Sequence, residues 1–138
     1  MTPPRPEPGA KKPVRRSKRL DPYETLLHVC LTKDEVLVWC KRFNWDEEAP
    51  DSAGVTYDAT DTKTHEYHVV VYIDVNQPDT YVINTITHEA VHVGGMILTH
   101  VGQKHNGMSE AFAYLVGYVA EYIHAEWNKT KEKNNGEA

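Results

Sequence analysis

Residues 80–103 contain no lysine or arginine and only one acidic residue, Glu89. Apolar residues recur through this segment three or four positions apart, which is the spacing of one face of an α-helix. They are Val82, Ile86, Ala90, Val93 and Ile97. This pattern predicts a helix that buries one stripe in the core of a folded domain. Because "VNQPD" breaks the preceding strand, Pro78 or Asp79 is expected to open the helix.

The segments on either side of this helix have different patterns. Residues 54–74, "GVTYDATDTKTHEYHVVVYID", alternate apolar and polar side chains around a turn-rich centre, which predicts a β-hairpin. Residues 108–127, "MSEAFAYLVGYVAEYIHAEW", predict a second long helix with Asn106 or Ser109 as its N-cap. The last segment, 129–138, is polar and is expected to fray.

Residues 21–43, "DPYETLLHVCLTKDEVLVWCKRF", have a mostly helical rhythm of apolar residues. Thr32 followed by Glu35 matches a capping box, so this segment is expected to form one broken helix or two consecutive helices. These sequence patterns together predict a single α+β domain over residues 21–128. Its expected order is N-terminal helices, a small antiparallel sheet, then two helices.

Charge divides the chain of 138 residues unevenly. Residues 1–20 hold seven Lys or Arg and one acid, a charge of +6, and residues 21–138 hold eight and 19, a charge of −11, giving the net −5. A basic, proline-rich arm with few apolar residues is expected to be disordered. It is interpreted either as a tether to nucleic acid or another acidic surface, or as a solubilising tail. The acidic body argues against sequence-specific DNA binding by the folded part.

Composition also bears on location and on cysteine chemistry. No stretch approaches 18 uninterrupted apolar residues, so no membrane span is predicted. The N-terminus lacks the apolar core of a signal peptide, which makes the cytoplasm the expected location. Cys30 and Cys40 are too few for a disulfide framework or a four-cysteine zinc site, and both are expected to be buried free thiols.

The central predicted helix carries "HEAVH" at residues 88–92, an HExxH motif. On a helix His88 and His92 lie one turn apart on the same face, where two imidazoles can bind one zinc ion. Glu89 lies beside them and can accept a proton from a water activated by the metal. The alternative is chance, since about four of every hundred chains of this composition contain the motif. The uncharged segment around it favours the metal site.

A catalytic zinc takes three protein ligands and keeps one position for water. The third histidine of the metzincin pattern would fall at Leu98, which cannot bind a metal. Glu110 lies 18 positions after His92, at the start of the last predicted helix, and is the favoured third ligand. His105, in the preceding loop, is the rival.

Small residues also favour Glu110. Ala113 and Gly117 share a helical stripe with it, and they are expected to let the last helix approach the motif helix closely. Gly94 and Gly95 on the motif helix would match them.

The residues "HEAVH" followed by "SEAFAYLVGYV" resemble the zinc metallopeptidases of the gluzincin group, and more narrowly the short metallopeptidases encoded by bacteriophages. The resemblance extends over residues 55–123. It implies a minimal zincin-like domain with one zinc ion held by His88, His92 and Glu110, and Glu89 as general base. It also implies hydrolysis of a peptide or protein substrate, in the host cytoplasm if a phage encodes the chain.

Peptide hydrolysis also needs a group that stabilises the oxyanion. Tyr114, His105 and His100 are the candidates, and the sequence does not choose among them. In such folds an extended substrate commonly adds to the edge strand ahead of the motif helix, for which residues 65–74 are the candidate, and an ordinary core strand is the alternative. The alternative function is a non-catalytic, zinc-containing binding or inhibitory module whose basic arm holds a nucleic acid or protein partner.

Overall fold

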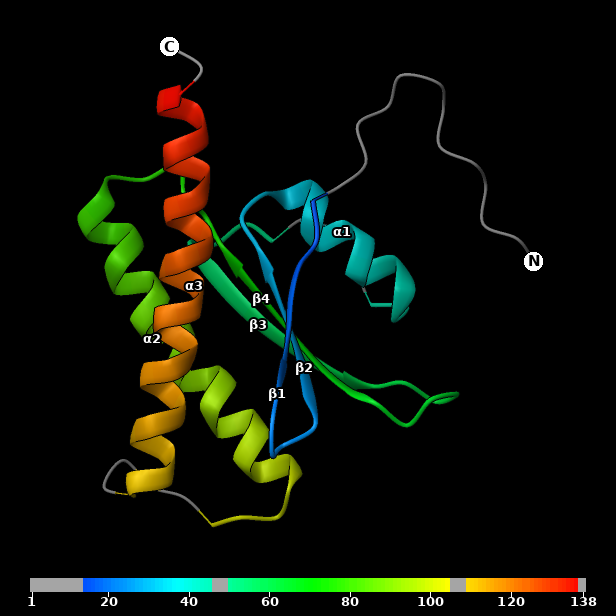
Figure 1. Cartoon of the computed structure of the whole chain (residues 1–138). Helices are drawn as coiled ribbons and strands as arrows, with labels where there is room; N and C mark the ends of the chain where they lie inside the picture. The colour runs from blue at the N-terminus through cyan, green and yellow to red at the C-terminus, as the bar shows by residue number, and fades with distance from the viewer. Residues whose placement is uncertain (1–13, 46–49, 105–108, 137–138) are drawn as a thin grey trace.

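The computed structural model describes residues 14–45, 50–104 and 109–136. Within these residues the chain is α+β, with three helices and one four-stranded mixed sheet. The sheet separates two helical layers, with α2 and α3 on one face and α1 on the other (Figure 1). In chain order the elements are β1 (Arg16–Leu20), β2 (Thr25–Cys30), α1 (Lys33–Arg42), β3 (Gly54–Thr60), β4 (Tyr67–Ile73), α2 (Asp79–His100) and α3 (Glu110–Gly136).

The strand order is β1-β2-β4-β3. The predicted hairpin is confirmed, because β3 pairs antiparallel with β4. The sheet is nevertheless mixed, since β2 runs parallel to β4. The prediction that residues 65–74 form the edge strand is wrong. Strand β4 lies between β2 and β3 and is buried along its whole length, which leaves β3 as the edge beside it.

The predicted helix across residues 21–43 is wrong in its first half. Thr25–Cys30 forms strand β2, whose residues face both helical layers. A short apolar run fits either a buried strand or a buried helix, and pairing with two neighbouring strands decides it here. The capping prediction is confirmed. The backbone N–H of Glu35 donates to Thr32 Oγ1 at 3.2 Å, and the Thr32 hydroxyl donates to Glu35 Oε2 at 2.7 Å.

The sequence assigned residues 16–20 to the disordered arm, but they form strand β1, paired with β2. The Arg16 guanidinium forms an ion pair with the buried Glu35 carboxylate and lies 4.0 Å from Glu126, which is also buried. Strand β1 is basic and lacks an alternating pattern of apolar residues. The contacts of Arg16 with buried carboxylates therefore help to stabilise it. Residues 1–13, the rest of the predicted arm, lie outside the described residues.

The main core lies between the sheet and the α2–α3 layer. The predicted apolar stripe of α2 is confirmed, because all five of its residues are buried. Pro78 is the N-cap and the helix begins at Asp79, as expected. A second core lies between the sheet and α1 and includes Cys30 and Cys40, which are free, buried thiols as predicted. Within the described part of the chain, no helix is long and apolar enough to cross a bilayer.

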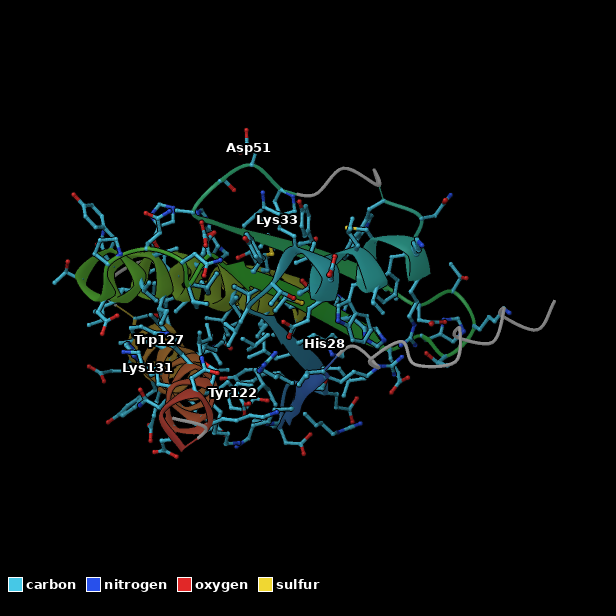
Figure 2. All side chains as sticks on the ribbon, turned by 90° about the horizontal axis from the view of Figure 1, so that it is seen from above. His28, Lys33, Asp51, Tyr122, Trp127 and Lys131 are labelled. Carbon is cyan, nitrogen blue, oxygen red and sulfur yellow. The ribbon has the colours of Figure 1, made fainter. Side chains whose placement is uncertain are left out.

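Helix α3 extends further than the sequence indicated. Ser109 is its N-cap, because its hydroxyl oxygen accepts the N–H of Phe112 at 3.1 Å, while Asn106 lies outside the described residues. The segment predicted to fray from residue 129 continues helix α3 to Gly136 in this structure. Lys131 lies on the ring of Trp127, 3.7 Å from its centre, and 2.7 Å from Oδ2 of Asp79 (Figure 2). The ion pair with Asp79 links the end of α3 to the start of α2.

Candidate metal centre

The side chains of His88, Glu89 and His92 come together on α2. One ligand atom from each lies within 4.8 Å of the other two, and no other such group of three occurs among the described residues. The two imidazole Nε2 atoms are 3.3 Å apart. Two nitrogen ligands of a tetrahedral zinc, each at about 2.0–2.1 Å, lie about 3.3 Å from one another. The spacing fits a zinc ion, although neutral rings can also share a hydrogen bond at this distance.

The three side chains differ in burial. His88 and His92 are exposed, whereas Glu89 is only 4% exposed. The Thr56 hydroxyl, on β3, donates a long hydrogen bond of 3.5 Å to Glu89 Oε1. Burial raises the pKa of the Glu89 carboxyl above its usual value, and the two imidazoles and Thr56 oppose that rise. A carboxylate with a raised pKa is a stronger base, which suits proton transfer near neutral pH.

Strand β3 packs directly on the motif helix. A Cβ atom added to Gly54 would lie 2.7 Å from Cγ2 of Thr85 and 2.9 Å from Cγ of Glu89, which is closer than atoms tolerate. Any larger residue would therefore force the Thr85 or Glu89 side chain to shift where the strand passes the motif helix. Since side chains alternate along a strand, Gly54, Thr56 and Asp58 all face α2.

Two cavities lie along α2, one on each side of the metal-binding group. The first has a volume of about 260 Å³ and includes His88 and Glu89 in its wall. The second has a volume of about 490 Å³ and includes His92. The second is lined by Asp58, Tyr67, Val91, His92, Gly95, Met96, Thr99, His100 and Phe112. An extended molecule lying across the three side chains would place groups in both cavities.

Tyr67 forms the floor of the larger cavity. Its hydroxyl donates to Asp58 Oδ2 at 2.7 Å and lies 3.3 Å from the Met96 carbonyl oxygen. Its ring stacks on His100 with 3.7 Å between ring centres. Burial, together with the Asp58 carboxylate, raises the pKa of the Tyr67 hydroxyl, so it remains protonated and keeps Asp58 in place.

Glu110 does not join the three residues of α2 in this structure. It is the first residue of α3 and is exposed. The same turn nevertheless lies next to the site, because Phe112 lines the cavity shared with His92. Phe112 also packs on Gly94, whose added Cβ would lie 3.6 Å from its ring.

The small-residue argument that supported Glu110 is wrong. Gly117 is exposed and a Cβ added there would meet nothing within 4 Å. Helix α3 instead packs through its large apolar stripe, because that removes more apolar surface from water. Val116 of this stripe lies 3.0 Å from a Cβ added to Gly94.

The predicted oxyanion groups are also separated. Tyr114 is 76% exposed on the outer side of α3, and His105 lies outside the described residues. Of the three candidates, His100 is the one that lines the cavity beside His92. Sequence reasoning missed Asp58 and Tyr67. The alternation of polar residues along residues 54–60 was a usable signal for Asp58, but the face that meets α2 could not be read from it.

The centre therefore combines two exposed imidazoles, a buried carboxylate and two cavities beside the edge strand β3. Comparisons with protein-family models, with curated proteins and with solved structures found no match to this chain. The function has to be inferred from the donor atoms, their burial and the cavities next to them.

Proposed function

We propose that this chain is a zinc-dependent metallopeptidase with a minimal zincin-like domain. The observation that carries the proposal is the 3.3 Å separation of the His88 and His92 Nε2 atoms, with the Glu89 carboxylate in the same group. Two exposed imidazoles with a buried carboxylate base beside them on one helix are the donor set of a metal-dependent peptidase. The cavities on either side add room for a substrate that extends past the metal in both directions.

We assign the third ligand to Glu110, with His105 as the rival. Glu110 begins the helical turn whose Phe112 lines the cavity beside His92, which supports this assignment. Coordination would require that turn to rearrange, because the Glu110 side chain is exposed and lies outside the group formed by His88, Glu89 and His92. Two imidazoles and one carboxylate form a common set for a catalytic zinc.

Bound at this site, zinc would polarise the scissile carbonyl and lower the pKa of the attacking water. Glu89 accepts the proton of that water and delivers it to the leaving amine. Strand β3 has one edge that no other strand of the described residues pairs with, and an extended substrate can add there as a further strand. His100, in the larger cavity, is the remaining described candidate for stabilising the oxyanion.

The decisive experiment compares the wild type with Glu89→Gln in zinc. Glu89→Gln should bind one equivalent of zinc and lose peptide hydrolysis by at least about a hundredfold, because it removes the general base. Glu121→Gln, an exposed carboxylate on α3, is the matched control and should keep full activity. Full activity of Glu89→Gln on a substrate that the wild type cleaves would refute the mechanism. Stoichiometric zinc without any Glu89-dependent hydrolysis would instead favour the non-catalytic binding module.

Zinc titration tests the ligands separately. Replacement of His88 or His92 by alanine should weaken zinc binding by at least about tenfold to a hundredfold, since each removes a bond to the ion. Glu110→Ala should do the same, and Glu121→Ala should not. Unchanged zinc affinity in Glu110→Ala would mean that another residue is the third zinc ligand.

A further inference from the structure

The cavity beside His92 contains one carboxylate, the exposed Asp58, in a lining that also includes apolar, hydroxyl and imidazole side chains. Asp58 enters it from β3, with one oxygen held by the Tyr67 hydroxyl at 2.7 Å. None of the ion pairs formed by the described residues includes Asp58. The cavity therefore offers a fixed negative charge that no cation of the described chain neutralises.

Part of the wall around this charge is apolar. Val91, Met96 and Phe112 line that part, and the volume of about 490 Å³ lies in the range typical of ligand pockets. Lysine and arginine side chains combine an apolar stem with a cationic end, and they bury the stem while the charge finds a partner. A neutral apolar side chain would cover part of the exposed Asp58 carboxylate without offering it a new partner, which is unfavourable.

We propose that this cavity binds a lysine or arginine side chain of the substrate, next to the bond that is cut, with Asp58 as the residue that determines this specificity. The inference rests on the proposed peptidase function, because it makes the cavity a subsite of that centre. The stem packs on Val91 and Met96, and the cation meets the free oxygen of Asp58. The net −11 charge of residues 21–138 adds a general attraction for basic peptides.

The test uses binding as well as cleavage. The probes are blocked hexaalanine peptides with arginine at one position, each paired with the same peptide carrying citrulline, the uncharged analogue of arginine. Zinc-loaded Glu89→Gln should bind the best arginine peptide at least about tenfold more tightly than its citrulline partner. Asp58→Asn in that background should abolish the difference, because asparagine still accepts the Tyr67 hydrogen bond but lacks the charge. Asp34→Asn, an exposed carboxylate on α1, should leave the difference intact.

The outcomes separate the two proposals. Arginine preference in the binding assay with no hydrolysis by the wild type would overturn the peptidase function and leave the cavity assignment standing. Hydrolysis with equal binding and cleavage of arginine and citrulline peptides would overturn the cavity assignment alone. The assignment also fails if no arginine peptide binds. It fails too if Asp58→Asn loses zinc, which would make Asp58 a metal ligand.

Discussion

Acid should destabilise this fold through His28, which is buried in the layer between the sheet and α1. Its Nδ1 lies 2.6 Å from the Ser17 hydroxyl, its Nε2 lies 2.9 Å from Nδ1 of His68, and its ring stacks on Trp39 with 3.8 Å between centres. Burial lowers the pKa of His28 from 6.5 to about 3, and the charge of His68 adds to the effect. The buried Nε2 atom of His68 has no hydrogen-bond partner among the residues that the structure describes, and none of them offers it an acceptor for an added proton.

The sign follows from the two pKa values. Above 6.5 the imidazole is neutral in both the folded and the unfolded chain, and the free energy of unfolding is unaffected. As the pH falls from 6.5 towards 3, the unfolded chain binds a proton that the folded protein does not, so stability is lost. At about pH 5 the His28 pKa shift alone removes about 2 kcal/mol. That is a large part of the roughly 5–15 kcal/mol that holds a typical domain folded.

The assay is urea denaturation of the metal-free protein at about pH 7.5 and about pH 5, with a chelator present so that zinc release does not contribute. His28→Gln should show a smaller loss between these pH values than the wild type, by about 2 kcal/mol. His124→Gln, a half-buried histidine on α3, is the control for histidine removal. Equal losses in the wild type and His28→Gln would refute the reasoning. If His28→Gln does not fold, NMR titration of the wild type gives the same test, because the His28 ring should not protonate above pH 5.

Further predictions concern packing and the end of α3. Gly54→Ala should lower the free energy of unfolding by about 1–3 kcal/mol, because its Cβ would lie 2.7 Å from Thr85. Gly117→Ala, with open space at its Cβ, should instead raise it by up to about 1 kcal/mol through helix propensity. Denaturation of both variants measures the contrast, and equal signs would contradict it. Lys131→Ala should cost about 0.5–1 kcal/mol through lost ring and ion-pair contacts, whereas exposed Lys133→Ala should change stability by less than about 0.5 kcal/mol.

Local signals in the sequence predicted several elements correctly. The apolar stripe of α2, the cap at Thr32 and the β3–β4 hairpin depend on neighbours within a few residues, and the structure confirms each. The arrangement of the HExxH residues is also predictable from local sequence, because two side chains four positions apart on a helix share a face. Their 3.3 Å separation follows from that spacing and from the ring orientations.

Long-range contacts explain the errors. Residues 25–30 form a strand because β4, 42 residues later in the register, pairs with them in parallel. A short apolar run carries no period that reveals this. Strand β1 depends on buried carboxylates of α1 and α3 that accept Arg16. Neither partner is visible from the local pattern of the strand.

The sequence by itself determined that two imidazoles would share one face of a helix with a carboxylate one step round it, because helical periodicity places them there whatever surrounds them. Only the tertiary structure decided which residues lie next to them. The packing of β3 on α2 through Gly54 brings Asp58 to the cavity next to His92, and the large apolar stripe of α3 turns Tyr114 and Gly117 towards solvent. Which side chains face the cavity and which face solvent depends on how the helices and strands pack to bury the most apolar surface. That packing is a property of the assembled fold.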